Sequence, residues 1–231
     1  SILDADDTEN SNTNVDEYST SGKNKRVLDY VNKNYALDNL IPKHISELHR
    51  KGVLYQHDLD NYNVGNHNCI TVDFEDLFEN NQGFKTRNTD VRKPNSIMTF
   101  FQLVAVVFQL ESQCQFGGIS SAKIDTEAAP YVRITFEKKF KNALMDCRDY
   151  SKEEAERIIY DLKKEDENMI HLGNKKLQEL YPIEYKVAKR HTVEETEQAC
   201  ESLYHNLGTL ESRAGSQLPF TSINYGLDTT E

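Results

Sequence analysis

The residues best suited to chemistry lie between positions 57 and 69. They are two histidines, an aspartate, an asparagine and a cysteine: His57, Asp58, His67, Asn68 and Cys69. A thiol can donate a hydrogen atom or a proton, and imidazole and carboxylate groups can transfer protons or hydrogen-bond to hydroxyl and phosphate groups. An isolated cysteine is more often a small buried hydrophobic residue, and Asn, Asp and Gly in this segment are also typical of turns. From these residues alone, a structural and a chemical interpretation both stay open.

The cysteines do not predict a metal site. The other three are Cys114, Cys147 and Cys200, and the four together form no CxxC pair, whereas zinc sites use closely spaced ligands. A site built from the two histidines and Asp58 is disfavoured because a flexible loop separates Asp58 from His67. We therefore assign no metal ligand and expect the other three cysteines to be structural.

The composition and charge limit the classes of partner that the protein could bind. Hydrophobic residues make up 37% and charged residues 28% of the 231, and the formal charge is −11. This charge disfavours a broad nucleic-acid footprint but permits one nucleotide in a local pocket. The longest apolar run, Ile97–Leu110, is shorter than the roughly 20 residues that span a bilayer. With an acidic start and no apolar leader segment, we expect a cytoplasmic protein with reduced thiols and neither membrane nor nucleic acid as a partner.

The elements that must position these residues are long helices separated by short strands, which predicts an α/β fold. Helices are expected at Lys25–Leu37, Pro42–Lys51, Ser96–Gln115 and Thr126–Asp146, and two capping boxes, Ser151–Glu154 and Thr192–Glu195, are expected to open further helices. Strands are expected at Val53–Asp60, Cys69–Phe74 and Leu218–Tyr225, and the mostly charged segment Lys163–Arg190 is expected at the surface.

Three further patterns have both a binding and a structural interpretation. Gly117–Ser121 could approach a phosphate, or its glycines could end a helix. The loop Ser212–Gln217, with Ser216 and Gln217, could meet a phosphate or be a plain loop. Three glutamines share one face of the predicted helix at 96–115, which could bind a ligand along its edge or be the polar side of a core helix. They are Gln102, Gln109 and Gln113, with Lys123 just beyond the helix.

Four stretches, in order along the chain, resemble segments of the anaerobic (class III) ribonucleoside-triphosphate reductases. Residues 8–14 (Thr-Glu-Asn-Ser-Asn-Thr-Asn) are similar to the segment that follows the family's regulatory ATP cone. His57-Asp-Leu-Asp60 with His67-Asn-Cys69 resembles its strand bearing an active-site cysteine. Residues 115–125 (Gln-Phe-Gly-Gly-Ile-Ser-Ser-Ala-Lys-Ile-Asp) with 129–132 resemble the segment after its dimer-forming helix. Residues 210–224 (Leu-Glu-Ser-Arg-Ala-Gly-Ser-Gln-Leu-Pro-Phe-Thr-Ser-Ile-Asn) resemble a later barrel strand and its preceding loop.

The resemblance implies a fold and a reaction. The family builds a ten-stranded α/β barrel of the ribonucleotide reductase and glycyl-radical enzyme type, and it replaces the ribose 2′-hydroxyl by hydrogen. A glycyl radical generates a thiyl radical on a loop cysteine, and formate or a thiol system supplies electrons. We expect residues 1–24 to be a polar lead-in after an absent ATP cone, and residues 25–231 to be the first half of the barrel. The radical glycine, the loop cysteine and the zinc-binding cysteines are expected outside this helix-rich fragment, which alone would be inactive.

The resemblance also assigns roles to residues of this chain. Cys69 would be the catalytic thiol. The residues expected to bind the ribonucleoside triphosphate are His57, Asp58, His67, Asn68, Ser216 and Gln217. Those expected to bind a dNTP or ATP effector at a homodimer interface are Gln102, Gln109, Gln113 and Lys123. A radical-SAM activating enzyme would be a further partner. Two alternatives stay open, namely a nonenzymatic dimeric nucleotide-binding module and another glycyl-radical enzyme of the pyruvate formate-lyase kind.

Overall fold

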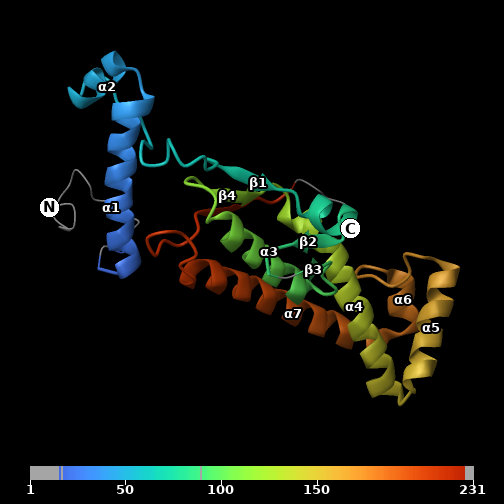
Figure 1. The fold of residues 1–231 in the computed structure, drawn as a ribbon. Helices are drawn as coiled ribbons and strands as arrows, with labels where there is room; N and C mark the ends of the chain where they lie inside the picture. Colours follow the sequence, from blue (N-terminus) through green and yellow to red (C-terminus); the bar gives the residue numbers. More distant parts are fainter. Residues whose placement is uncertain (1–15, 17, 89, 227–231) are drawn as a thin grey trace. The chain divides into compact units, whose positions relative to one another are not determined.

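The structure is a computed structural model that describes residues 16, 18–88 and 90–226 (Figure 1). The resemblance at residues 8–14 therefore lies outside the described residues. Along the chain the elements are α1 (Thr20–Tyr35), the π-helical turn η1 (Ala36–Leu40), α2 (Lys43–Arg50), β1 (Ile70–Val72), the π-helical turn η2 (Asp76–Asn80), β2 (Gly83–Lys85), β3 (Asp90–Arg92), α3 (Ile97–Glu111), β4 (Ile119–Ser121), α4 (Ile124–Arg148), α5 (Lys152–Glu165), α6 (Lys175–Leu180), α7 (Pro182–Thr209) and β5 (Thr221–Ile223).

The chain forms two compact units, each made from segments far apart in the sequence. Unit 1 comprises Ser1–Thr71, Val107–Ser120 and Leu207–Ser222, and unit 2 comprises Val72–Val106, Ser121–Asn206 and Ile223–Glu231. The strands β1, β4 and β5 and the helix α3 each contain residues of both units. All residues that line the pocket discussed below belong to unit 1.

The small parallel sheet has the strand order β1-β4-β5. Within unit 1, the Ile70 amide donates to the Gly118 carbonyl at 3.0 Å, and the Ile119 amide donates to the Phe220 carbonyl at 2.8 Å. Helices separate these strands in the sequence, as parallel pairing requires, because a crossover connection must return the chain to the same edge. The α/β class predicted from the sequence is therefore confirmed.

Unit 2 also holds an antiparallel hairpin of β2 and β3, in which Phe84 pairs with Val91. Gly83 has a φ of +117°, and a Cβ atom there would lie 2.0 Å from the Val91 carbonyl oxygen. Only glycine fits this left-handed position beside the neighbouring strand.

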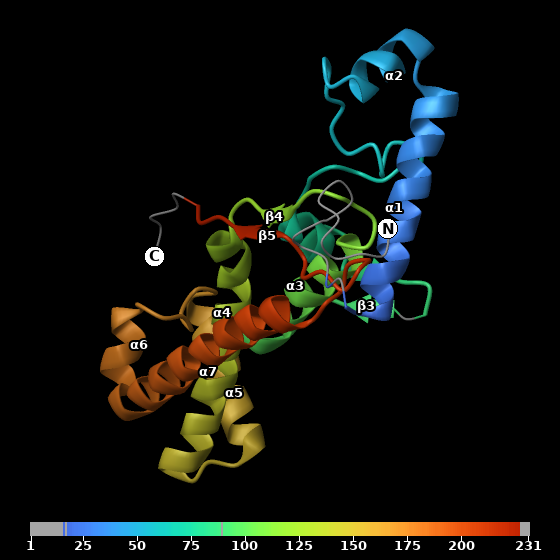
Figure 2. The same ribbon diagram turned by 90° about the vertical axis from the view of Figure 1, so that its left-hand side faces the viewer.

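The core of unit 2 consists of two groups of buried side chains. Aromatic rings of η2, α3 and α4 form the first, in which Phe100 stacks on Tyr131 with 4.7 Å between ring centroids. The second joins α4, α5, α6 and the start of α7, with Phe136, Phe140, Leu177 and Tyr185 among its members. Both views show α5 beside the C-terminal part of α4 (Figures 1 and 2).

In unit 1, α1 leads through η1 into α2. Ser19 caps α1, since its hydroxyl accepts a hydrogen bond from the Gly22 amide at 2.9 Å. Ala36, Leu37 and Leu59 form a small apolar cluster. The buried Ser46 hydroxyl donates to the Leu37 carbonyl at 2.7 Å, which ties α2 to the preceding turn.

Most predicted helices are confirmed, with shifted ends. The capping box at Ser151 and Glu154 opens α5 as predicted, and both of its hydrogen bonds are present. The one predicted at Thr192 is wrong: Thr192 lies inside α7, where its hydroxyl donates to the Ala188 carbonyl at 2.8 Å. A threonine can bond back to the preceding helical turn, so the motif alone does not mark a helix start.

Two other predictions need correction. Residues 53–60 form no strand, because 53–56 are irregular and 57–60 form a turn. The charged segment Lys163–Arg190 is not simply a surface segment, because Met169, Ile170 and Leu177 are buried in the unit 2 core. Among the described residues, no helix combines the length and the apolarity that crossing a membrane requires.

Candidate functional site

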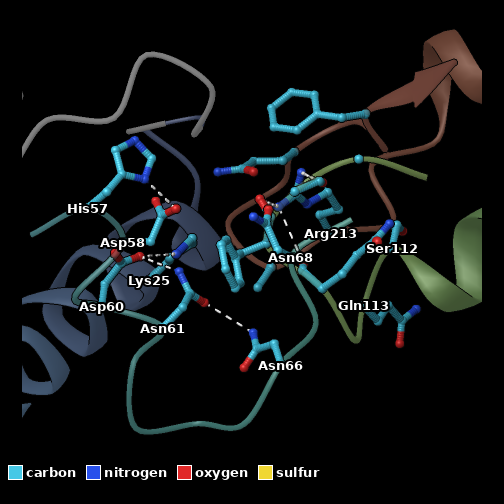
Figure 3. Close-up of a pocket in the computed structure, with 17 residues that line it drawn as sticks. Lys25, His57, Asp58, Asp60, Asn61, Asn66, Asn68, Ser112, Gln113 and Arg213 are labelled. Carbon is cyan, nitrogen blue, oxygen red and sulfur yellow. Dashed lines mark hydrogen bonds and ion pairs between the residues drawn. The ribbon is translucent and has the colours of Figure 1, made fainter. Parts of the chain in front are cut away.

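A pocket of about 460 Å³ lies within unit 1. Its lining comes from α1, from the loop at 57–68, from residues 112–118 after α3, and from residues 213–220 before β5 (Figure 3). This volume is in the range typical of small-molecule sites, roughly 300–1,000 Å³. The lining is mostly polar, with amides, carboxylates and two cationic side chains.

One side of the pocket is a network of charged and amide groups (Figure 3). The Lys25 ammonium lies 2.7 Å from the Asp29 carboxylate and 3.8 Å from that of Asp60. The Asn61 amide donates to Asp60 at 2.8 Å, and the Asn66 amide donates to Asn61 at 3.1 Å. Burial raises the pKa of Asp29 above its ordinary value, although its bond with Lys25 acts in the opposite direction.

His57 and Asp58 stand together at another side of the pocket. The His57 Nδ1 atom is 2.5 Å from an Asp58 carboxylate oxygen, which orients the imidazole ring. Asp58 has a φ of 53°, a left-handed conformation that Asp tolerates better than most residues. This pair can exchange a proton with a ligand or accept hydrogen bonds from it.

Cys69 directly precedes β1, and a pair of glycines lies against it. Its thiol donates to the Asn68 side-chain oxygen at 3.4 Å, and the Gly118 amide donates to its sulfur at 3.5 Å. The Gly117 amide donates to the Asn68 carbonyl at 2.7 Å. Both glycine amides are therefore engaged within the protein, which weakens the phosphate-loop interpretation. The helix-ending interpretation is wrong, because α3 ends at Glu111.

Arg213 fixes the backbone beside these glycines. Its guanidinium donates to the carbonyl oxygens of Phe116 at 2.8 Å, Gly117 at 3.2 Å and Gln115 at 3.4 Å. It also lies over the Phe220 ring, 4.5 Å from the centroid. Burial lowers the pKa of Arg213 below its ordinary value. The sequence suggested that the loop Ser212–Gln217 could meet a phosphate. In the structure the donors of Arg213, which belongs to this loop, hold the segment at 115–117 instead.

Two buried glutamines line the pocket. Gln217 was predicted to bind substrate, and its backbone carbonyl accepts from the Arg213 amide at 3.1 Å. Gln115 was not singled out, and its side-chain oxygen and nitrogen have no hydrogen-bond partner among the described residues. The only sequence signal for Gln115 was its place at the start of the Gln-Phe-Gly-Gly stretch. Lys25 gave no signal for the pocket, because its ion pair with Asp29 is local to α1 and its approach to Asp60 joins segments that are remote in the sequence.

The pocket gathers some of the predicted substrate residues. His57, Asp58, Asn68 and Gln217 line it. As the described residues form it, the lining does not include Cys69, His67 or Ser216. The backbone of exposed His67 bonds to Cys114 and Phe116, and the Ser216 hydroxyl lies 3.2 Å from that of Ser19 at the start of α1.

The residues predicted to bind an effector have different surroundings. Gln102 is exposed on α3 and Gln109 is half-buried there. Gln113 lies beyond the end of α3 and lines the pocket. Lys123 belongs to unit 2, where its ammonium pairs with Glu75 at 2.6 Å, and this bond raises the pKa of Lys123.

Within the part of the chain that the structure describes, no group of three or more His, Cys, Asp and Glu side chains could hold a metal ion.

Comparison with known proteins agrees with the sequence resemblance. A profile of the family described as anaerobic ribonucleoside-triphosphate reductase matches residues 9–231. The protein of that name from Haemophilus influenzae is 31% identical over 226 residues, which cover 96% of this chain and 26% of the relative. The protein of the same name from Enterobacteria phage T4 is 29% identical over 158 residues, which cover 66% of this chain and 26% of the relative. That from Salmonella typhimurium is 28% identical over 227 residues, which cover 96% of this chain and 26% of the relative. The chain spans about a quarter of the length of these relatives, and it belongs to the anaerobic ribonucleoside-triphosphate reductase family.

Proposed function

We propose that this chain supplies one wall of the substrate site of a cytoplasmic anaerobic ribonucleoside-triphosphate reductase, which converts a ribonucleoside triphosphate to its deoxy form. One observation carries the proposal: His57, Asp58, Asn68 and Gln217, named from the sequence, line one pocket of small-molecule size. The names of the relatives support the activity.

The polar lining favours the sugar of the nucleotide over its triphosphate. Hydroxyl groups both donate and accept hydrogen bonds, and amide side chains such as that of Asn66 can meet both requirements. The cations that line the pocket are already occupied: Lys25 pairs with Asp29, and Arg213 donates to backbone carbonyls. The triphosphate would thus extend toward groups outside this pocket.

Cys69 is the candidate chemical group of this chain. The thiol adjoins the wall that Asn68, Gly117 and Gly118 form, and the Gly118 amide bonds to its sulfur. We propose that Cys69 donates a hydrogen atom to C2′ of the ribose and that the reductant, formate or a thiol system, restores the thiol. The His57–Asp58 pair would protonate the 2′-hydroxyl, which leaves as water. The glycyl radical that starts such chemistry, and the family's zinc site, are proposed for other parts of the whole protein.

The remaining architecture and partners follow from family membership as proposals. β1, β4 and β5 would be strands of the ten-stranded barrel. The exposed side of α3, which carries Gln102, Val106 and Leu110 at four-residue spacing, would pair with a second copy near a dNTP or ATP effector. A radical-SAM enzyme would install the radical.

The test replaces Cys69 in the full-length protein. Cys69→Ala should lower deoxynucleotide formation below detection, because the proposed hydrogen donor is gone. The glycyl-radical signal in electron paramagnetic resonance should stay near the parent level. The matched control is Cys147→Ala on α4, an exposed cysteine that lines neither pocket nor sheet, and it should keep the parent activity. Product formation by Cys69→Ala at the parent rate would remove Cys69 from the chemistry.

A further inference from the structure

Gln115 presents a buried amide without a partner. Its side chain is only 4% exposed, and neither its oxygen nor its nitrogen has a hydrogen-bond partner among the described residues. Gln115 also belongs to the lining of the pocket. Burial of an unpaired amide disfavours the folded state, so such groups in native proteins call for an explanation.

The backbone around Gln115 holds the residue in this place. The His67 amide donates to the Cys114 carbonyl at 3.2 Å, and the Phe116 amide donates to the His67 carbonyl at 3.0 Å. Arg213 donates to the Gln115 carbonyl at 3.4 Å. With its main chain fixed from two sides, Gln115 cannot reach solvent by a simple shift of the loop.

The asparagine side chains of the pocket lining already have protein partners. Asn61 and Asn66 bond to each other, and the Asn68 side-chain oxygen accepts from the Cys69 thiol. Gln115 differs from them in that both ends of its carboxamide are available. Its missing partner must therefore offer a donor and an acceptor side by side. A phosphate group, which at neutral pH mainly accepts hydrogen bonds, would leave the carboxamide oxygen unpaired.

We propose that Gln115 is a positioning residue for the nucleotide, and that its carboxamide pairs with a donor–acceptor group of that ligand. This inference rests on the proposed function. Two parts of a nucleotide carry the required chemistry, namely the ribose hydroxyls and the hydrogen-bonding edge of the base.

The test uses Gln115→Met in the full-length protein, because methionine keeps the length and removes the polar atoms. Calorimetric titration would measure the Kd of each of the four ribonucleoside triphosphates and of each matching 2′-deoxy compound. We expect at least a tenfold higher Kd for the substrate, with a thermal unfolding midpoint no lower than that of the parent. The matched control is Gln178→Met, at an exposed position on α6, which should change neither quantity.

The ligand series identifies the contacted group. If Gln115 meets the ribose, the loss should be large for the ribonucleotides and small for the 2′-deoxy compounds. If it meets the base, the loss should differ between bases and be equal for the ribo and deoxy forms. Unchanged Kd values throughout, or a lowered unfolding midpoint, would overturn the inference. If the parent itself binds none of the eight compounds, the proposed function fails with it.

Discussion

Gly117 shows how closely the backbone at 115–118 approaches the segment that carries Cys69. A Cβ atom at Gly117 would lie 2.3 Å from the Asn68 carbonyl oxygen and 2.6 Å from the Cys69 sulfur. At Gly118 the nearest atom would be the Phe220 carbonyl oxygen at 3.4 Å, an ordinary contact. The first glycine is therefore required by space, whereas the second is not.

We predict that Gly117→Ala is destabilising and Gly118→Ala is nearly neutral. The methyl group at Gly117 must displace Asn68 or Cys69, and overpacking of this kind costs about 1–3 kcal/mol. Urea unfolding of the two variants would measure the difference, and turnover of the full-length protein should fall for Gly117→Ala alone. Equal unfolding midpoints for both variants would contradict the close packing.

Sequence reasoning identified the pocket-lining residues that carry a local signal. His57, Asp58 and Asn68 are reactive or amide residues crowded into one short segment, and they do line the pocket. Lys25 and Gln115 escaped notice because their position depends on contacts between segments far apart in the sequence. For Gln115 the informative property is the lack of a partner, which no sequence pattern records.

At the scale of the element, α3 also shows a limit of what the sequence can predict. Its apolar run predicted a helix, and Ile97, Val104 and Phe108, which share one face of that helix, are completely buried. The exposed side of α3 contains Val106 and Leu110, which are 37% and 38% exposed. Which apolar residue faces outward depends on the packing of the whole unit, and an evenly apolar helix gives no such information.

The exposed side of α3 gives a prediction for the proposed dimer. Val106→Glu in the full-length protein should raise the dimer dissociation constant at least tenfold, because a charge would be buried against its twin. Light scattering across a concentration series would measure the dimer dissociation constant. The matched control is Val193→Glu, a similarly exposed valine on α7, which should leave the dimer intact. Val104→Glu is unsuitable because it places a charge in the core. A dimer undisturbed by Val106→Glu would place the interface elsewhere.

At the scale of the whole molecule, the parallel sheet is too small to enclose a site. Its three strands are β1, β4 and β5, whereas about eight strands are needed to close a barrel around a filled interior. The α/β class followed from the alternation of helices and strands, but the barrel requires strands beyond these. Family membership excludes the pyruvate formate-lyase alternative. The proposed site thus needs the whole protein, of which this chain matches about a quarter of the relatives' length.

We predict that the 231-residue chain alone forms no deoxynucleotide. Cys69 is its one proposed hydrogen donor, and the resemblance assigns the radical that must activate the substrate to a residue outside this sequence. The assay would combine the purified chain, the activating enzyme, a reductant and ribonucleoside triphosphates under strict anaerobiosis, with the full-length protein as the positive control. Product would be measured by chromatography. Deoxynucleotide formation by the chain alone, lost on Cys69→Ala, would show that the catalytic groups have been assigned to the wrong part of the protein.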